Sequence, residues 1–454
     1  MPFVAKDSDY YNNLFSTPAM RSVFTDSSHF EAWLRTEIAL TKAQEQVGLI
    51  PKGVSERLQK SASINKFNKS EMKAEFEKIG FPILPFVKQL TKLCDPETAR
   101  WVHYGTTTQD ILDTGMVLQI RDGLRLIEGD QTGIIQTLIT LVRKHHYTVM
   151  AGRTFQQLAA PITFGYKAAV WLDEILRHQQ RLQEIKPRLL VGQCAGAVGT
   201  FAPLGDKGLE VQRLMMEELG LGVPDITWHT ARDRWSELVS WMAMLASTLA
   251  KIANEVALLM RSEIGELSEP FETGRGASTT LPQKRNPIAC EPIIANAHRL
   301  RELASSQMIA MIQEHERGAL GQMHLEWMVM PDAFLFLSGA LHHSRFILEN
   351  LWVDIANMRK NLDLQGGLIM SEAVMMGLAS KVGKSKAHHM VYAAAGKSRD
   401  AGITLREAIL DDKDIMKHLS EKELDKLLDP VNYIGSAGEM VEAVLAKAQI
   451  KSNE

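Results

Sequence analysis

The feature that most constrains the fold is a long stretch, from Arg234 to Ile264, that contains neither glycine nor proline. This run is longer than the ~8–20 residues of typical globular helices and predicts a long helix of a bundle. Near the N-terminus, Ser28 and Glu31 have the spacing of a capping box and predict a helix that starts near Phe30. Strand patterns are few, and apolar residues at helical spacing predict further helices over 111–127, 164–185, 287–312 and 332–362.

These segments predict an all-α protein in three parts. We expect an N-terminal helical domain over residues 1–112, a central bundle of long helices over 113–365, and a C-terminal helical domain over 366–454. The last boundary falls at Gly366–Gly367, because adjacent glycines interrupt a helix. Long helices that are apolar on more than one face bury those faces either in the core of a bundle or in a subunit interface. The sequence leaves both alternatives open.

Composition excludes several classes of protein. The chain has 51 basic and 54 acidic residues, a net charge of −3, which excludes a strongly basic nucleic-acid binder and a polybasic membrane patch. Its three cysteines are too few and too scattered for a disulfide framework, and no metal-ligand or nucleotide-binding motif occurs. No signal peptide is visible, and the most apolar later stretch, 332–341, is shorter than the ~20 residues of a membrane span. We expect a cytoplasmic protein without cofactor, metal, nucleic-acid or membrane partner.

Glycine, hydroxylated and basic residues gather in one segment, Thr273 to Pro287. Its glycines give the backbone freedom, so Ser278 is expected on a mobile loop. Lys284 and Asn286 stand before the next predicted helix, with Pro287 suited to its first turn. A helix N-terminus beside a lysine suits a carboxylate or phosphate ligand, whereas the plain alternative is a solvated linker.

Two further polar segments, 101–110 and 152–161, are also predicted to open helices. The first contains three consecutive threonines, Thr106 to Thr108, which either offer donors to an anion or simply cap the helix. Three polar helix entrances together suggest one anionic substrate that is held from several sides.

The segment Ala277–Pro287 resembles the signature of the fumarase/aspartase superfamily, Gly-Ser-Ser-x-Met-Pro-x-Lys-x-Asn-Pro. His103–Asp110 resembles the first conserved region of that superfamily, and Gly152–Pro161 resembles the second. In detail the sequence is most similar to the bacterial 3-carboxy-cis,cis-muconate cycloisomerases of the adenylosuccinate lyase-like branch. Supporting stretches lie at 187–191, 228–233, 313–317, 361–364 and 428–435.

The resemblance implies a three-domain helical protomer and a homotetramer with active sites shared between subunits. It implies cofactor-independent removal of a proton next to a carboxylate of a small polycarboxylate, through an aci-carboxylate intermediate that needs preorganised donors. The reaction we expect is 3-carboxy-cis,cis-muconate lactonisation in aromatic catabolism. The alternative is a C–N or C–X lyase that releases fumarate from a substituted succinate or aspartate, like adenylosuccinate, argininosuccinate or nitrosuccinate lyases. A catalytically silent helical oligomer is a third hypothesis, and the retained Ser278, Lys284 and Asn286 argue against it, although Ala277, Thr279 and Leu281 depart from the signature.

By position in the resembling motifs, Ser278 matches the serine base, and Lys284 and Asn286 match residues that bind a carboxylate. His103 is a second catalytic candidate through substrate contact, and His229 a third, as a proton donor or as an anchor of a helix entrance. The other expected substrate-binding residues are Thr107, Thr108, Arg153, Thr154, Gln157, Thr279 and Arg317, the last of which has an ion pair with Glu314 or Glu316 as its structural alternative.

Departures from the family pattern bear on the reaction. Phe155 stands where fumarases and amine-releasing lyases usually carry a histidine that protonates the leaving group. Phenylalanine carries no proton, whereas a carboxylate leaving group, with a free pKa of about 4, needs none. Phe155 therefore disfavours a fumarase and, less strongly, an amine-releasing lyase, and it is compatible with a cycloisomerase. Leu158, in contrast, stands where the bacterial cycloisomerases often have histidine, which leaves another substrate with a good leaving group open.

Overall fold

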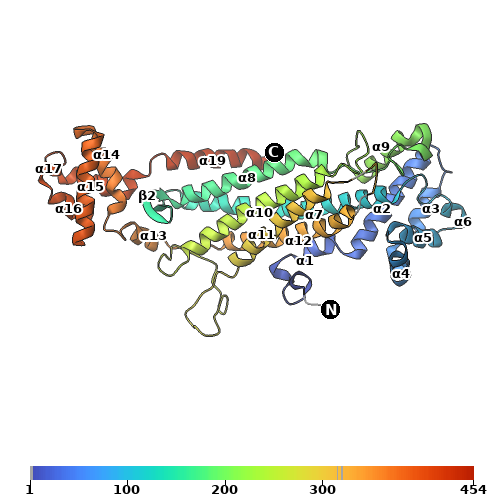
Figure 1. The fold of residues 1–454 in the computed structure, drawn as a ribbon, viewed down its shortest axis with the longest axis horizontal. Helices are drawn as coiled ribbons and strands as arrows, with labels where there is room; N and C mark the ends of the chain where they lie inside the picture. The colour runs from blue at the N-terminus through green and yellow to red at the C-terminus, as the bar shows by residue number, and fades with distance from the viewer. Residues whose placement is uncertain (1–3, 314, 319–320, 454) are drawn as a thin grey trace. The chain divides into compact units, whose positions relative to one another are not determined.

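The computed structural model describes residues 4–313, 315–318 and 321–453, with side chains to residue 449, and it is predominantly helical (Figure 1). The α-helices are α1 (Pro18–Val23), α2 (Asp26–Gln46), α3 (Val54–Ser61), α4 (Lys69–Ile79), α5 (Ile83–Leu93), α6 (Pro96–Ala99), α7 (Thr108–Lys144), α8 (Phe164–Leu189), α9 (Gly208–Leu219), α10 (Asp233–Leu259), α11 (Cys290–Ala310), α12 (Gln322–Glu349), α13 (Ile355–Leu362), α14 (Ser371–Val382), α15 (Lys384–Ala401), α16 (Leu405–Leu410), α17 (Lys413–Met416), α18 (Glu421–Leu428) and α19 (Ala437–Asn453). Short 3-10 helices are η1 (Ala5–Asp7), η2 (Asn12–Leu14), η3 (Ile64–Lys66), η4 (Ala202–Lys207), η5 (Leu368–Met370) and η6 (Pro430–Tyr433).

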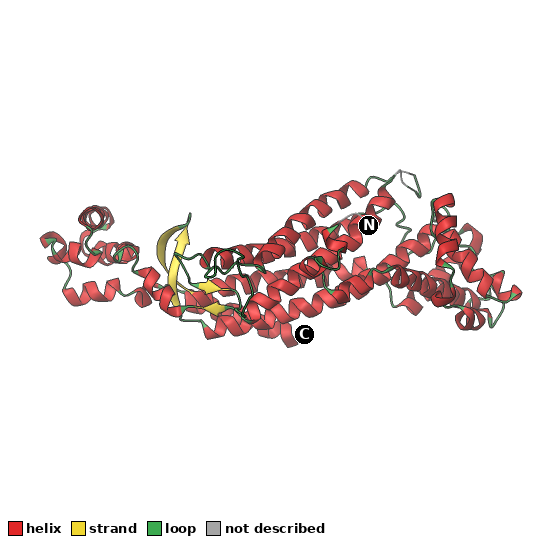
Figure 2. Cartoon of the chain, turned by 90° about the horizontal axis from the view of Figure 1, so that it is seen from below, coloured by secondary structure: helices red, strands yellow, loops and turns green. Residues whose placement is uncertain are grey.

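Strands are confined to two small antiparallel sheets in the described part of the chain (Figure 2). The first is a hairpin of β1 (Val149–Thr154) and β2 (Gln157–Thr163). The second pairs β3 (Leu267–Ser268) with β4 (Trp352–Val353). The prediction of a helical fold is thus confirmed, with two local β-elements that helical periodicity did not indicate.

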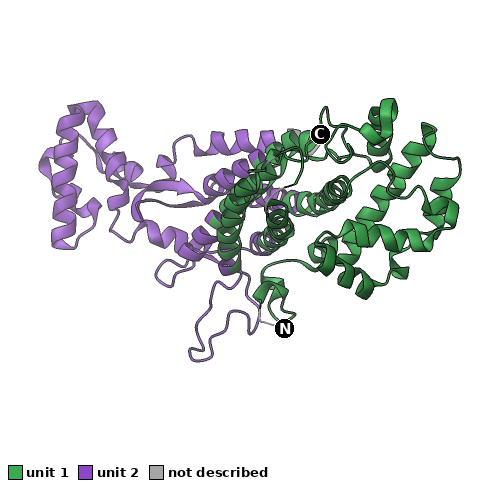
Figure 3. Ribbon diagram, turned by 45° about the vertical axis from the view of Figure 1, so that its right-hand side comes forward, with its two compact units in different colours: residues 1–131, 178–250, 292–342 green, residues 132–177, 251–291, 343–454 purple. Residues whose placement is uncertain are grey.

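The chain separates into two compact units, each assembled from three stretches of sequence (Figure 3). Unit 1 comprises residues 1–131, 178–250 and 292–342, and unit 2 comprises residues 132–177, 251–291 and 343–454. Five long helices, α7, α8, α10, α11 and α12, have residues in both units. The expected domains 1–112, 113–365 and 366–454 are continuous in sequence, unlike these units, and they remain a prediction.

Unit 1 has a core that joins its N-terminal helices to the long helices. Trp33 of α2, Phe86 of α5 and Ile111 of α7 are buried in one apolar cluster. The rings of Trp33 and Phe86 meet edge to face, with centroids 5.4 Å apart, a favourable aromatic geometry. This packing fixes α2 against the start of α7, where the first of the polar segments lies.

Unit 2 contains the hairpin and a group of short C-terminal helices. The helices α14, α15, α16 and α18 bury an apolar cluster that includes Val374, Val391 and Leu424. The C-terminal α19 lies along α8, where Lys447 Nζ is 2.7 Å from Asp173 Oδ1 (Figure 1). Gly366 and Gly367, the predicted break, both have a positive φ between α13 and η5.

Several predicted helix boundaries differ from the observed ones. The capping box at Ser28 was wrong, because α2 begins at Asp26 and Thr25 accepts a hydrogen bond from the Ser28 amide at 3.1 Å. The helix predicted over 332–362 is interrupted, since α12 ends at Glu349 and β4 precedes α13.

One helix in the described part of the chain, α10, is long and apolar enough to suit a membrane span. More than half of its most apolar window, 56%, is buried inside the protein. Trp241, Met242 and Leu245 of α10 are each no more than 1% exposed. We therefore identify α10 as a core helix.

Candidate active site

The predicted site residues fall into one group in each unit. Unit 1 contains His103, Thr107, Thr108, His229 and Arg317. Unit 2 contains the residues of the hairpin and of the signature segment, namely Arg153, Thr154, Gln157, Ser278, Thr279, Lys284 and Asn286.

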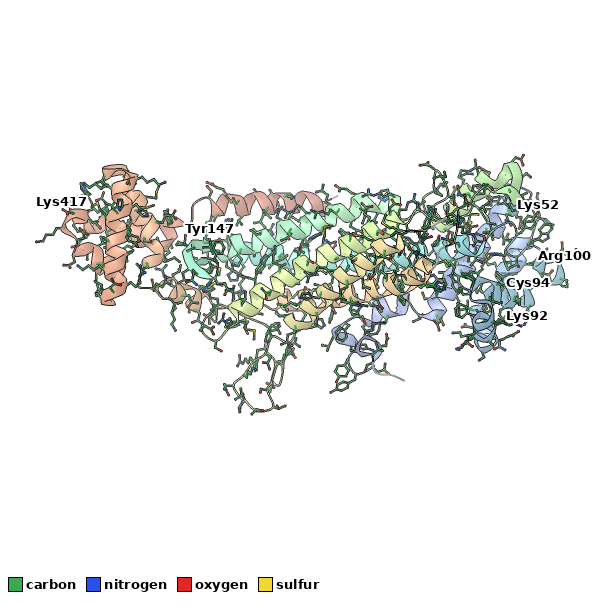
Figure 4. All side chains as sticks on the ribbon, viewed as in Figure 1. Lys52, Lys92, Cys94, Arg100, Tyr147 and Lys417 are labelled. Atoms are coloured by element: carbon green, nitrogen blue, oxygen red, sulfur yellow. The ribbon has the colours of Figure 1, made fainter. Side chains whose placement is uncertain are left out.

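The signature segment forms a long loop of unit 2 between β3 and α11, and it projects away from the helices (Figures 1 and 3). Its side chains stand out from the loop backbone (Figure 4). Gly276 has φ +66°, and a Cβ there would lie 2.8 Å from the Asn286 carbonyl oxygen, so this position requires glycine. The Asn286 backbone and side-chain nitrogens both donate to the Gly276 carbonyl, at 3.1 and 3.0 Å. Asn286 therefore closes the loop on itself.

The hydroxyl oxygen of Ser278 accepts hydrogen bonds from two backbone amides. The Thr280 amide lies 3.3 Å and the Leu281 amide 3.1 Å from Ser278 Oγ. Donors that point at an oxygen favour its anionic form, because they stabilise the charge that develops when its proton leaves. The local fold of the loop thus supplies part of the stabilisation that a serine needs to act as a base.

The start of α11 is not free for a substrate. The helix begins at Cys290, three residues after Pro287. The buried carboxylate of Glu269 accepts from the Ala289 amide at 3.0 Å and the Cys290 amide at 2.8 Å. A carboxylate at a helix N-terminus satisfies otherwise unpaired amides and interacts well with the helix dipole. The expected use of this helix end by a substrate carboxylate is therefore wrong, and Glu269 anchors the base of the loop instead.

Lys284 is exposed on the loop and lines a cleft of about 1100 Å³ in unit 2. Arg285 lines the same cleft with its guanidinium 3.8 Å from the centre of the Phe271 ring. Thr279 is exposed, with its hydroxyl 3.5 Å from that of Thr280. The loop thus carries a serine, a neighbouring hydroxyl and an exposed ammonium on one accessible segment.

The second polar segment is a β-hairpin rather than a helix entrance, which corrects the prediction. Phe155 and Gln156 form its two-residue turn with φ +49° and +63°, the left-handed conformations of a tight hairpin. Thr154 and Gln157 are paired across the turn, and Phe155 is 99% exposed at the tip. The helix that follows, α8, begins only at Phe164.

Arg153 has a structural partner that sequence reasoning missed. Its guanidinium donates to both carboxylate oxygens of Glu266, at 2.9 and 2.7 Å, and Glu266 is fully buried. Asn361 Nδ2 donates to the same carboxylate at 2.7 Å. This bidentate pair ties the hairpin to the segment before β3. A role of Arg153 in substrate binding remains a prediction.

The first polar segment does open a helix, as predicted, because α7 begins at Thr108. Its centre is the buried carboxylate of Asp110. This carboxylate accepts from the Thr106 hydroxyl and the Thr107 amide, at 2.9 and 3.0 Å. It also accepts from the amides of Ala195 and Gly196, at 3.1 and 2.9 Å. Asp110 therefore joins the start of α7 to the segment that follows α8.

His229 completes the Asp110 network. Its Nε2 lies 2.8 Å from Asp110 Oδ1, its Nδ1 lies 3.2 Å from Thr227 Oγ1, and its side chain has no exposed area. Both ring nitrogens therefore have protein partners and neither is open to a substrate in the protomer. This geometry favours the anchoring alternative for His229 over that of proton donor.

His103 has a different environment. Its Nδ1 lies 2.6 Å from the Oε1 of Glu37, whose side chain is fully buried, while the histidine side chain is 21% exposed. Burial acts to lower the pKa of His103, but the charge and hydrogen bond of Glu37, with a contribution from Asp110, raise it above its ordinary value. Glu37 was not predicted from the sequence, although it lies in the apolar stripe of α2 between Trp33 and Leu40.

Arg317 is exposed in unit 1, and its Nε donates to the Ala197 carbonyl at 2.8 Å. No ion pair with Glu316 occurs among the residues that the structure describes, and Glu314 lies outside them. The choice between a substrate contact and a structural role thus stays a prediction.

Beneath the first segment lies a buried charge network that the sequence did not predict. Arg232 donates to both oxygens of Asp113, at 2.8 and 3.0 Å, and to both oxygens of Glu326, at 3.0 and 2.8 Å. Its guanidinium also stacks 4.1 Å from the ring centre of Trp235. Although burial opposes it, the two carboxylates raise the pKa of Arg232, so its charge is permanent.

The helical fold, the signature loop and the buried first segment together define a lyase of the fumarase/aspartase type. Residues 14–301 match the family described as "Lyase", and residues 367–444 match "Adenylosuccinate lyase C-terminus". The chain belongs to the fumarate lyase superfamily, and it is an enzyme of that superfamily.

Several known proteins are similar over nearly their whole length. The solved structure of a fumarate lyase from Mesorhizobium sp. BNC1 is 42% identical with a TM-score of 0.90, and the match covers 95% of this chain and 98% of that chain. The 3-carboxy-cis,cis-muconate cycloisomerase of Pseudomonas aeruginosa is 39% identical, with 96% of each protein covered. The N-acetyl-S-(2-succino)cysteine lyase of Dickeya dadantii is 38% identical, again with 96% of each covered.

Proposed function

We propose that this enzyme is a cofactor-independent cycloisomerase or lyase that acts on a small polycarboxylate through an aci-carboxylate intermediate. The observation that carries the proposal is the pair of backbone amides that point at Ser278 Oγ. In the elimination direction, the Ser278 alkoxide takes the proton next to a carboxylate, and the electron pair moves into that carboxylate. In the addition direction, the Ser278 hydroxyl returns the proton to the same carbon.

Lys284 provides the positive charge for this chemistry. The intermediate carries two negative charges on one carboxylate, so a nearby ammonium stabilises it more than the substrate. The position of Lys284 on the same loop as Ser278 supports this role, and Asn286, which closes the loop, supports the placement of both. The proposed steps need only proton transfer and charge stabilisation by side chains and amides.

The reaction that we propose first is 3-carboxy-cis,cis-muconate lactonisation. In that reaction a carboxylate adds to a double bond, and in reverse it leaves without protonation, because its free pKa is about 4. Phe155, fully exposed at the hairpin tip, has no proton to give, and this agrees with a leaving group that needs none. The similar cycloisomerase from Pseudomonas aeruginosa supports the same substrate.

The second candidate is the release of fumarate from a succinylated thiol. Leu158 favours it, because cycloisomerases often carry a histidine there, and the similar N-acetyl-S-(2-succino)cysteine lyase supports it. A thiolate, with a free pKa of about 8.5, is a better leaving group than an amine and also departs without a strong acid. This is a particular case of the C–X lyase alternative.

We infer a homotetramer in the cytoplasm, with active sites shared between subunits. The family resemblance supports this assembly, and the apolar side chains that α11 exposes, Met308 and Ile309, suit a subunit contact. Sedimentation of the purified protein tests it: a tetramer is expected, and a stable monomer that turns over substrate contradicts it.

A substrate panel tests the proposed reaction. Purified enzyme is mixed with 3-carboxy-cis,cis-muconate, N-acetyl-S-(2-succino)cysteine, adenylosuccinate, argininosuccinate, aspartate and nitrosuccinate, and ultraviolet absorbance follows muconate loss or fumarate release. We expect turnover of the first or, for the second candidate, of the succinylated thiol. Turnover of an amine-releasing substrate alone would overturn the argument from Phe155. Activity should survive exhaustive chelation, and a loss that added metal restores contradicts the cofactor-independent mechanism.

A further inference from the structure

The His103–Glu37 pair of unit 1 combines a buried carboxylate with a partly accessible imidazole. Glu37 is fully buried on α2, and its Oε1 lies 2.6 Å from His103 Nδ1. Its other oxygen, Oε2, has no hydrogen-bond partner among the described residues. A buried carboxylate with a free oxygen is costly unless a cation stands beside it, so the environment favours the protonated ring.

The backbone of His103 has an unfavourable conformation that surrounding contacts must stabilise. Its φ is +60°, a left-handed conformation that is uncommon for a residue with a side chain and persists where surrounding contacts fix it. With Nδ1 turned toward the buried Glu37, the opposite ring nitrogen, Nε2, lies at the accessible part of the side chain. Nε2 has no partner within the described protein, so it is available as a donor to a ligand.

A second histidine, His29, lies on α2 as Glu37 does, and it shows how the carboxylate affects the pKa of an imidazole. His29 of α2 also makes a 2.6 Å hydrogen bond through Nδ1, but its partner is the neutral amide oxygen of Gln119. Burial lowers the pKa of His29, whereas the pKa of His103 is raised beside Glu37. A charged partner thus raises the pKa of a mostly buried ring, whereas a neutral partner leaves burial to lower it.

The other titratable groups near His103 do not replace Glu37. Asp110 adds to the same effect from α7, but its carboxylate already has five donors, including His229. Cys194 is fully buried, and burial, Asp110 and Glu37 raise its pKa, so its thiol stays neutral. Glu37 is thus the group bonded directly to the ring.

We infer that Glu37 is a positioning residue that holds His103 as an imidazolium, with Nε2 outward, to bind a carboxylate of the substrate. The inference rests on the proposed function and deepens it, because it assigns a second carboxylate-binding cation besides Lys284. Two cations suit a substrate with two carboxylates, so each is expected to bind a different carboxylate of one polycarboxylate. A monocarboxylate would then be a poor substrate.

Steady-state kinetics of Glu37→Gln test the inference. The amide keeps the size and a hydrogen bond but removes the charge. Because the imidazolium binds a carboxylate in the ground state and the transition state alike, KM should rise roughly 10-fold or more while kcat changes little. In the wild type, kcat/KM should fall as the pH rises through the pKa of His103, and in Glu37→Gln that fall should occur at lower pH. Unchanged KM and pH profile would overturn the inference.

His29→Gln is the matched control. It removes an imidazole of similar setting from the same helix, but one that bonds to a neutral amide. We expect its KM and pH profile to match those of the wild type. A KM rise in this variant as large as that in Glu37→Gln would show that disturbance of α2, rather than loss of charge, is responsible, and would overturn the inference.

A measurement without substrate separates this inference from the proposed function. Diethyl pyrocarbonate modifies neutral imidazole, so the labelling rate of the His103 peptide against pH, read by mass spectrometry, gives the midpoint of its protonation. We expect a midpoint above the ordinary value of about 6.5 in the wild type and a lower one in Glu37→Gln. Labelling of this kind, together with no turnover in the substrate panel, would reject the proposed function while keeping the role of Glu37. Identical midpoints would reject the role of Glu37.

Two further measurements test the inference even if Glu37→Gln does not fold. If Glu37→Gln does not assemble, Glu37→Asp keeps the charge on a shorter side chain and should retain the raised labelling midpoint of His103. The wild-type midpoint alone is also decisive, because a value at or below about 6.5 contradicts the imidazolium.

Discussion

The Asp110 network of unit 1 and the signature loop of unit 2 use similar polar residues in opposite ways. The Asp110 carboxylate and both ring nitrogens of His229 have protein partners, and both residues are fully buried. In the loop, Ser278 and Lys284 remain accessible, and the loop bonds mainly to itself. Satisfied and buried groups stabilise the fold, whereas accessible groups are available to a substrate. The sequence left His229 open between a proton donor and an anchor of a helix entrance, and its buried, fully bonded ring favours the anchor.

The largest expected effect is on catalysis at the loop. Ser278→Ala removes the proposed base, so kcat should fall by roughly 10²–10⁴-fold, while the free energy of unfolding changes by less than about 0.5 kcal/mol. Initial rates and thermal unfolding measure the two quantities. Thr273→Ala, which removes an exposed hydroxyl from the same loop, is the control and should keep the wild-type kcat. Near-normal turnover of Ser278→Ala would reject the base assignment.

The next effect is on stability beneath the first segment. Arg232→Met leaves the carboxylates of Asp113 and Glu326 without their cation in a buried site, so the free energy of unfolding should fall by about 3–5 kcal/mol. The exposed Arg213 is the control, because Arg213→Met breaks only surface pairs and should leave the free energy of unfolding nearly unchanged. Equal losses in denaturant unfolding of the two variants would contradict the comparison.

A smaller kinetic effect is expected at Lys284. Lys284→Ala removes one exposed ammonium, which should lower kcat/KM by roughly 10–100-fold without a change in unfolding. Lys284→Arg keeps the charge and should recover part of the loss, since the guanidinium has a different shape. If kcat/KM of Lys284→Ala equals that of the wild type, the carboxylate contact is wrong.

The smallest effect is expected at His229. His229→Asn leaves Asp110 Oδ1 with one donor fewer, so unfolding should become easier by about 1–3 kcal/mol, and kcat of the folded enzyme should be unchanged. A large fall in kcat with wild-type stability would return His229 to the role of proton donor and would break the distinction between the two regions.

Much of the fold could be predicted from the sequence because long helices leave a strong periodic signal. The glycine- and proline-free run predicted α10, and adjacent glycines predicted the break after α13. The hairpin was missed because its turn, Phe155–Gln156, has none of the usual turn residues and adopts positive φ without glycine. The start of α2 was misplaced because Thr25 and Ser28 are both capable caps, and sequence alone does not choose between them.

Site residues that share one sequence motif could be predicted. Those whose partners are distant in sequence could not. Ser278, Lys284 and Asn286 share one motif, and they lie on one loop. Glu37, Glu266 and Glu269, in contrast, act through partners that are between 20 and 113 residues away in sequence. Their common signal is a carboxylate that is buried among apolar neighbours, which a single sequence shows only for Glu37, within the stripe of α2.

Hydrogen–deuterium exchange of Ser278→Ala, with and without the substrate that the wild type turns over, tests the central claim most directly. Without its base the variant should hold the substrate unreacted. We predict that substrate slows exchange in peptides from the loop, 270–288, and leaves those around His229 unchanged, since the ring of this buried residue is already bonded within the protein. Unchanged exchange in the loop at saturating substrate would contradict the assignment of the chemistry to the signature loop.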